Sequence, residues 1–144
     1  MSVNLKEVKE FIIGWNEDNT EEFYKVADEI WKNPELSMQE YKSSALLEDL
    51  LEKHGFQVER GVAGMPTAFI ATYGSGRPVI GINAEYDALP GLSQDREKLE
   101  KCPVTPGAPG QGCGHNLLGT GGVKAAIAVR NALEKYGLTG TVKV

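Results

Sequence analysis

Apolar positions in the first part of the chain predict a helix. Residues 5–31 carry apolar side chains mostly three and four positions apart, which is the spacing of one helical face. Gly14 predicts a kink or a split within this segment. Asn33-Pro34 ends it, because proline disfavours the helical conformation of the residue before it.

A second helix is predicted to follow at once. Ser37 and Glu40 match a capping box, in which the serine accepts a hydrogen bond from the backbone and the glutamate reaches back. The helix is expected to end at His54-Gly55, with the glycine as a left-handed cap. At a helix end a cationic His54 complements the helix dipole, which favours a structural role for it.

Three short strands are predicted next, over residues 56–60, 67–73 and 78–83. The last is an almost continuous apolar run, which is typical of a strand buried on both faces. Gly74-Ser-Gly76, between the second and third strands, predicts a hairpin turn.

The rest of the chain predicts a loop, a helix and a strand. Residues 85–116 show no periodicity and are rich in Gly and Pro, and a loop of this length is usually functional. A helix is predicted over 117–136, with Gly137 as its cap, and a strand over 139–144. The closing strand–helix–strand unit predicts a parallel pair. The fold class is therefore an α/β sheet with covering helices.

Charge and composition exclude several functions. The 144 residues carry a formal net charge of -5, and no run of Lys or Arg is present, which argues against nucleic acid and against an anionic membrane surface as partners. Residues 1–8 lack the apolar core of a signal peptide. The longest apolar stretch, 125–129, is too short to span a bilayer. A reducing cytoplasm is the expected compartment.

Two pairs of candidate site residues follow the predicted buried strand and the long loop. Cys113 and His115 are two residues apart, so in an extended segment both side chains face one side and could reach one metal ion, Zn²⁺ being well suited. Glu85 and Asp87 share this spacing, as metal ligands or as carboxylates that orient a ligating histidine. In open α/β sheets, ligands bind beyond the carboxyl ends of strands. Tyr86 is the aromatic residue placed to line such a site, and Asn116 is a second candidate.

Blander interpretations stay open at this point. Taken alone, the Cys-x-His pair is better explained by a buried thiol beside a surface histidine, and the acidic pair by an acidic turn before Leu89-Pro90. A non-catalytic α/β binding module with a structural metal at Cys102, Cys113 and His115 is one alternative. An α/β domain without metal is another.

The sequence around these residues resembles a known family. Glu85-Tyr-Asp87-Ala-Leu-Pro and Gly112-Cys-Gly-His-Asn-Leu-Leu-Gly119 resemble the aminoacylase/carboxypeptidase-type metallopeptidases of the M20 family, in their amidohydrolase subfamily. The resemblance covers essentially the whole chain, most clearly from Trp31-x-x-Pro34-Glu35 onward. Three further segments look most like the branch that hydrolyses p-aminobenzoyl-glutamate: Gly91-Leu-Ser-Gln94, Cys102-Pro-Val-Thr-Pro106 and Tyr136-Gly-Leu-Thr-Gly-Thr141.

This resemblance implies a zinc-peptidase-like fold and a reaction. Cys113 and His115 would be ligands of a centre of divalent metal, Zn or Mn, with two ions in a complete site. Glu85 stands where other branches carry a metal-binding histidine, and Asp87 at the aspartate that supports it. The implied reaction is hydrolysis of the amide between an acyl or aroyl group and an amino acid, in which the metals activate water and polarise the carbonyl.

The resemblance also implies that residues 1–144 are the N-terminal portion of a catalytic domain. The general-base glutamate of the family is expected just beyond Val144, so no catalytic base lies within the chain, and the dimerisation domain and C-terminal catalytic part are absent. The chain alone is expected to be inactive. A homo-oligomer, or a hetero-oligomer with a paralogous subunit, is expected for the longer protein, and the last strand is expected to leave an unpaired edge that favours self-association.

Overall fold

The computed structural model describes residues 4–144. The signal-peptide expectation rests partly on residues 1–3, which lie outside the described residues. The N-terminal helical segment is two helices, α1 (Leu5–Asp18) and α2 (Thr20–Lys32). The break falls at Asn19, not at Gly14, which lies within α1. Both the backbone N–H and the side-chain amide of Asn19 donate to the carbonyl oxygen of Trp15, at 3.1 and 2.8 Å, and this end cap stops α1.

Helix α3 (Tyr41–Lys53) begins later than predicted, and the capping box is not formed. Glu40 instead accepts a hydrogen bond from the Thr67 hydroxyl at 2.6 Å. The cap comes from Glu35, whose carboxylate accepts the backbone N–H groups of Lys42 and Ser43 at 3.0 and 2.8 Å. A carboxylate at this end also complements the helix dipole. The predicted end at His54-Gly55 is confirmed, with Gly55 at φ 81°.

A four-stranded sheet and a long helix complete the fold. The strands are β1 (Gln57–Arg60), β2 (Phe69–Ser75), β3 (Val79–Gly81) and β4 (Gly140–Lys143), a 3₁₀ turn η1 (Val62–Gly64) follows β1, and the long helix is α4 (His115–Tyr136). The sheet order is β1-β2-β4-β3, with β4 antiparallel to β2 and parallel to β3. The α/β class and the parallel pair around α4 are thus confirmed.

The predicted hairpin between the second and third strands is wrong, because β4 lies between β2 and β3. Ser75 pairs with Gly140, and Val79 pairs with Thr141. Strand β2 continues through Gly74, which the sequence places in a turn. A Cβ on Gly74 would lie 2.3 Å from the carbonyl oxygen of Gly140, so only glycine permits this close approach of the two backbones.

Two expectations about strand burial are also corrected. The apolar run of β3 is not buried on both faces, since Val79 and Ile80 are 55% and 54% exposed. The last strand is not at an edge, since β4 pairs on both sides. The strand with an unpaired, apolar edge is β3, because β4 is its only strand neighbour within residues 4–144.

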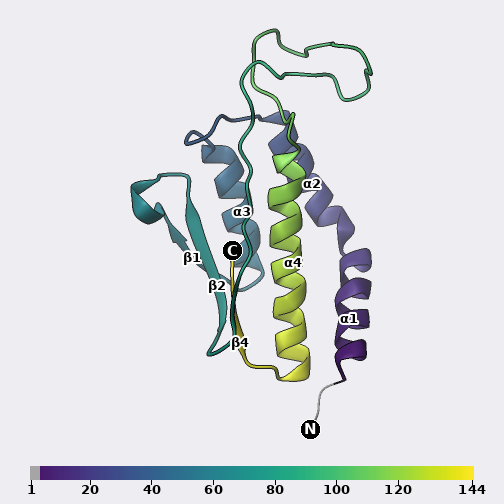
Figure 1. Cartoon of the computed structure of the whole chain (residues 1–144), viewed down its shortest axis with the longest axis vertical. Helices are drawn as coiled ribbons and strands as arrows, with labels where there is room; N and C mark the ends of the chain where they lie inside the picture. Colours follow the sequence, from purple (N-terminus) through teal and green to yellow (C-terminus); the bar gives the residue numbers. More distant parts are fainter. Residues whose placement is uncertain (1–3) are drawn as a thin grey trace.

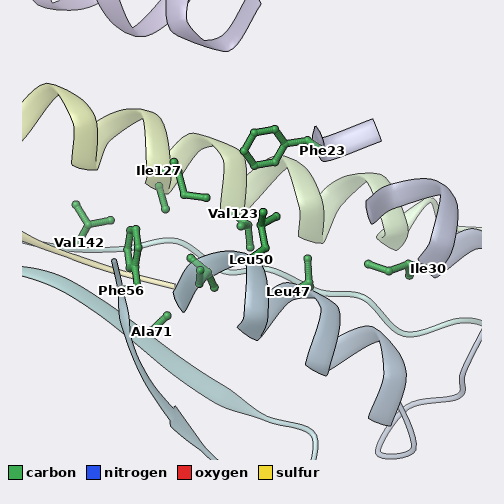
Figure 2. Packing of buried hydrophobic residues seen from close by; sticks show 11 residues of the cluster. Phe23, Ile30, Leu47, Leu50, Phe56, Ala71, Val123, Ile127 and Val142 are labelled. Carbon is green, nitrogen blue, oxygen red and sulfur yellow. The ribbon is translucent and has the colours of Figure 1, made fainter. Parts of the chain in front are cut away.

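The helices form a layer beside the sheet (Figure 1). Helices α3 and α4 pack on the strands, and α1 and α2 pack on α4. The core lies between these layers, where the side chains of Leu47, Val123 and Ile127 are fully buried (Figure 2). No helix in the described part of the chain is both long and apolar enough to cross a membrane. The loop between β3 and α4 extends past the end of the helices, at the top of Figure 1.

Candidate metal centre

The acidic segment 85–87 lies between β3 and this loop and is held at both ends. The backbone N–H of Ile82 donates to Lys143 at 2.8 Å, which prolongs the pairing of β3 with β4. The backbone N–H of Ala88 donates to the carbonyl oxygen of Glu35 at 2.7 Å. Glu35 therefore connects the start of α3 to the acidic segment, since its carboxylate caps the helix and its carbonyl oxygen holds Ala88, the residue after Asp87.

Two glycines of α4 allow the segment to lie directly on the helix. A Cβ on Gly119 would lie 2.6 Å from the carbonyl oxygen of Glu85, and a Cβ on Gly122 would lie 3.3 Å from the Ile82 side chain. Any larger residue at 119 would push the acidic segment outward. The glycines at the start of α4 thus set the distance between Glu85 and the helix that carries His115.

His115 is the centre of the polar cluster at this place. Its Nδ1 lies 2.7 Å from Oδ1 of Asp87, and its Nε2 lies 3.3 Å from Oε2 of Glu85. The imidazole is 20% exposed, so the cluster is open to solvent at one side. The acidic pair Glu85 and Asp87 and the distant residue His115 are therefore brought together.

This geometry fits a metal ligand. When Nδ1 carries the proton that Asp87 accepts, the Nε2 lone pair is directed toward the Glu85 carboxylate. Two such acceptors can share a cation between them, either a second proton or a metal ion. Two ligands of one tetrahedral zinc ion lie about 3.3 Å apart, because each metal–ligand bond measures about 2.0–2.1 Å, and the Nε2–Oε2 separation of 3.3 Å agrees with this value.

The cluster is not a complete site. Within residues 4–144, no group of three or more His, Cys, Asp or Glu side chains is arranged to hold a metal ion. Cys113 is exposed and precedes Gly114, which adopts a left-handed conformation at φ 74°. His115 is the first residue of α4, so the expectation of an extended Cys-Gly-His segment is wrong. The trio Cys102, Cys113 and His115 likewise forms no such group, and both cysteines are free thiols.

Tyr86 and Asn116 hold the site in place through internal contacts. The Tyr86 ring stacks on Phe69, with centroids 6.0 Å apart, and its hydroxyl donates to the carbonyl oxygen of Thr67. Burial, and then the nearby Glu40, raise the pKa of Tyr86, so the hydroxyl stays a donor. The Asn116 side chain is buried and donates to the carbonyl oxygen of Ala27 at 3.2 Å, which joins α4 to α2.

Sequence reasoning missed Glu35 as a residue that positions the site. The only available signal was its place in the Trp31-x-x-Pro34-Glu35 segment, which carries no periodic pattern. His54 has the structural role expected for it, because its Nε2 lies 3.0 Å from Glu22 on α2 and its ring stacks on Phe23.

The histidine–carboxylate cluster lies beyond a strand end of an α/β sheet, where such sheets bind ligands, and a histidine held by a carboxylate is typical of metal sites. No family model matches the sequence. The chain is 47% identical over 139 residues to one subunit of the p-aminobenzoyl-glutamate hydrolase of Escherichia coli, covering 96% of the chain and 29% of that protein. It is 33% identical over 125 residues to mouse Xaa-Arg dipeptidase, covering 80% of the chain and 25% of the relative.

Solved structures agree with these relatives. The Bacillus subtilis YXEP protein, described as a dinuclear metal-binding peptidase of the M20 family, superposes with a TM-score of 0.60 at 26% identity, over 84% of this chain and 33% of that one. A protein of methicillin-resistant Staphylococcus aureus shares the fold, with a TM-score of 0.70 at 23% identity, over 96% of this chain and 33% of that one. The chain is thus similar in sequence and in fold to metallopeptidases of the M20 family, and it spans less than a third of the length of the curated relatives it matches.

Proposed function

We propose that this chain provides part of a divalent-metal centre that hydrolyses an amide between an acyl or aroyl group and an amino acid. The observation that carries the proposal is the bridging position of His115 between Asp87 and Glu85. The similarity to an enzyme named for p-aminobenzoyl-glutamate supports amides of that kind as the substrate class.

The roles of the residues follow from their contacts. His115 would hold the metal through Nε2, with the Cys113 thiolate as a further ligand. Asp87 fixes the orientation of the ring and its tautomer through Nδ1. Glu85 is either a ligand or a charge that balances the cation. A divalent ion, Zn²⁺ or Mn²⁺, supplies Lewis-acid chemistry to water and to the amide carbonyl when bound.

The remaining parts of the reaction are proposed to come from outside residues 1–144. These are the general-base glutamate, the other ligands of a two-metal site, and a domain for dimerisation. The Escherichia coli relative is named as one subunit of its enzyme, which supports a second kind of subunit as a partner. Both cysteines are free thiols, which agrees with the reducing cytoplasm that we propose as the compartment.

Metal binding and activity test the proposal separately. Zn²⁺ titrated into residues 1–144 should bind, and His115→Ala should abolish this binding, whereas Cys102→Ser should retain it. Loss of zinc in Cys102→Ser would instead favour a structural ion at that cysteine. The chain should not hydrolyse p-aminobenzoyl-glutamate with Zn²⁺ or Mn²⁺ present, and metal-dependent turnover by residues 1–144 alone would overturn the assignment of the base to another part of the protein.

A further inference from the structure

A second candidate site lies in a cleft between the end of α2 and the loop after β3. The cleft has a volume of 450 Å³. Trp31 and Pro34 line it from the α2 side, and Leu92, Val104 and Pro109 line it from the loop. This size and mostly apolar lining are typical of sites for small molecules.

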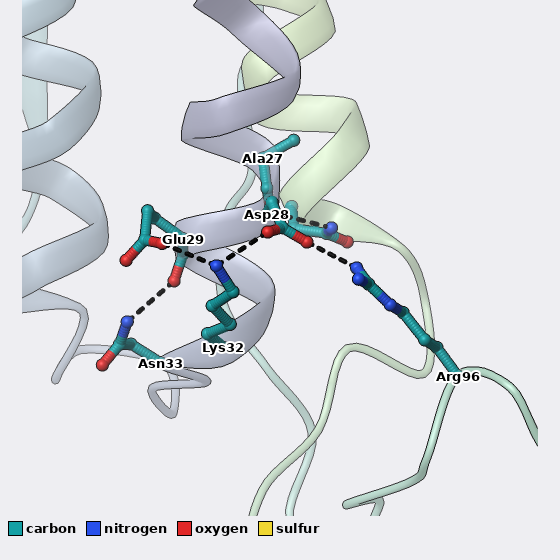
Figure 3. Close-up of polar contacts among 7 residues, drawn as sticks. Ala27, Asp28, Glu29, Lys32, Asn33 and Arg96 are labelled. Atoms are coloured by element: carbon teal, nitrogen blue, oxygen red, sulfur yellow. Dashed lines mark hydrogen bonds and ion pairs between the residues drawn. The ribbon is translucent and has the colours of Figure 1, made fainter.

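The charged groups of this cleft are all cations. Lys32 and Arg96 line it, and no Asp or Glu does. The Lys32 ammonium is already paired with two carboxylates outside this lining, Asp28 at 2.8 Å and Glu29 at 2.9 Å (Figure 3). The Arg96 guanidinium lies 5.1 Å from the centre of the Trp31 ring, and its Nη1 donates to Asp28 (Figure 3). Within residues 4–144 the other N–H groups of Arg96 make no hydrogen bond, so the guanidinium keeps donors for a ligand.

Gln111, one of the residues that line the cleft, carries a buried donor without a partner in the described part of the chain. Gln111 lines this cleft and also a neighbouring one of 620 Å³. Its side-chain oxygen accepts the backbone N–H of Asn116 at 3.1 Å, which fixes the amide group. Its Nε2 is buried and has no hydrogen-bond partner in the described part of the chain. Such a donor costs free energy unless an acceptor reaches it.

We propose that this cleft binds a small organic anion, consisting of a carboxylate on an apolar or aromatic body. The N–H groups of the Arg96 fork that Asp28 does not use donate to the carboxylate. Trp31, Pro34 and the apolar loop side chains contact the body. Asp28 does not line this cleft, and its ion pair with Arg96 keeps the guanidinium over the Trp31 ring. The site uses neither His115 nor Cys113, so it goes beyond the proposed function.

Benzoate and its uncharged analogue benzamide are suitable probes. Each is titrated into residues 1–144 while ¹H–¹⁵N NMR follows the Trp31 indole N–H and the Gln111 side-chain amide. Benzoate should shift both signals in a saturable way, and benzamide should bind at least about tenfold more weakly because it lacks the charge. The shifts should be unaffected by EDTA. Equal shifts from the two probes, or none from benzoate, would overturn the proposal.

Variants localise the binding. Arg96→Gln and Gln111→Glu should each weaken benzoate binding by about tenfold or more, since the first removes the charge and the second replaces the donor with an anion. Gln111→Glu keeps the oxygen that accepts the Asn116 N–H. Lys98→Gln is the matched control, because Lys98 lies on the same loop but does not line the cleft. Equal weakening in Lys98→Gln and Arg96→Gln would contradict the site.

Two further outcomes bear on the assignment. Arg96 is more than half exposed, so its variant tests the proposal even if Gln111→Glu does not fold. If the signals that benzoate shifts are centred on His115, and if the shifts vanish with EDTA, the binding belongs to the metal centre. That result would overturn the proposal of a binding site in the cleft.

Discussion

The Nδ1 atom of His115 lies 2.7 Å from the Oδ1 atom of Asp87, and this contact joins residues 28 positions apart in the sequence. The carboxylate orients the ring so that its other nitrogen faces Glu85. A ligand held in this way binds a metal more tightly than a free imidazole, because its orientation and tautomer are already fixed.

Replacement of Asp87 should therefore weaken metal binding. We expect Asp87→Asn to lower Zn²⁺ affinity about 10–100-fold, as measured by calorimetric titration of residues 1–144. Asp18→Asn, at the exposed end of α1, removes the same charge far from the cluster and should leave the affinity unchanged. Equal affinities in Asp87→Asn and the unaltered chain would show that the aspartate does not support the ligand.

Two substitutions near the start of α3 distinguish the observed cap, Glu35, from the predicted cap, Ser37. Glu35→Ala should lower the free energy of unfolding by about 1–2 kcal/mol, since it removes the acceptor of two backbone N–H groups. Ser37→Ala should change it by less than about 0.5 kcal/mol, as for other surface changes, because Ser37 is exposed. Urea denaturation measures both. A larger loss of stability in Ser37→Ala than in Glu35→Ala would instead support the predicted capping box.

Two glycines of α4 provide a matched pair for the packing of segment 85–87. Gly119→Ala should destabilise the chain by about 1–3 kcal/mol, because its Cβ would meet the backbone of Glu85. A Cβ at position 121 would have no neighbour within 4 Å. Gly121→Ala should therefore stabilise the chain by about 0.5–1 kcal/mol, because alanine has the higher helix propensity. Thermal unfolding measures the difference. An unchanged or raised stability in Gly119→Ala would contradict the close contact.

The pairing of Glu22 predicts a pH dependence of stability. Its hydrogen bond to Lys53, which outweighs the opposing effect of burial, and its contacts with His54 lower the pKa of Glu22 below the ordinary 4.5. A carboxyl group whose pKa is lower in the folded state stabilises that state at pH values above its unfolded-state pKa. This stabilisation is lost as the pH falls through the folded-state pKa. Glu22→Gln should therefore be less stable than the unaltered chain at pH 7.

The difference between these two proteins should shrink as the pH falls from about 5 to below the lowered pKa. Urea denaturation at several pH values measures it. Glu21→Gln is the control, because Glu21 is exposed and, among residues 4–144, pairs only with Lys25 on its own helix. This variant should show little change at any pH. A Glu22→Gln deficit of constant size down to pH 2 would contradict the role of the charge.

The exposed edge of β3 predicts self-association. Ile80→Lys should reduce it in sedimentation experiments, since a charge on an edge strand opposes pairing with another copy. Ile13→Lys makes the same change on α1, where Ile13 is 58% exposed, and should leave association unchanged. A clean monomer at high concentration before any substitution would contradict the expectation.

Local patterns in the sequence determined that these segments form helices and where two of the helices end. Gly55 and Gly137 end α3 and α4 as predicted, because a left-handed cap is specified by a single residue. The Glu85–Asp87 and Cys113–His115 motifs were also visible. The two motifs meet at His115, which contacts both carboxylates. These contacts depend on Gly119, and its role is seen only when the acidic segment is placed on α4.

The tertiary structure alone decided the order of the strands and the capping of α3. A short Gly-rich link between two apolar strands predicts a hairpin, but pairing also depends on competing strands elsewhere in the chain, and β4 arrives from a distant part of the sequence to pair with both β2 and β3. The same holds for Glu35, whose contact with α3 spans eight positions and follows no periodic pattern. Sequence periodicity specifies which face of an element is apolar, whereas the partner that covers this face is chosen by non-local packing.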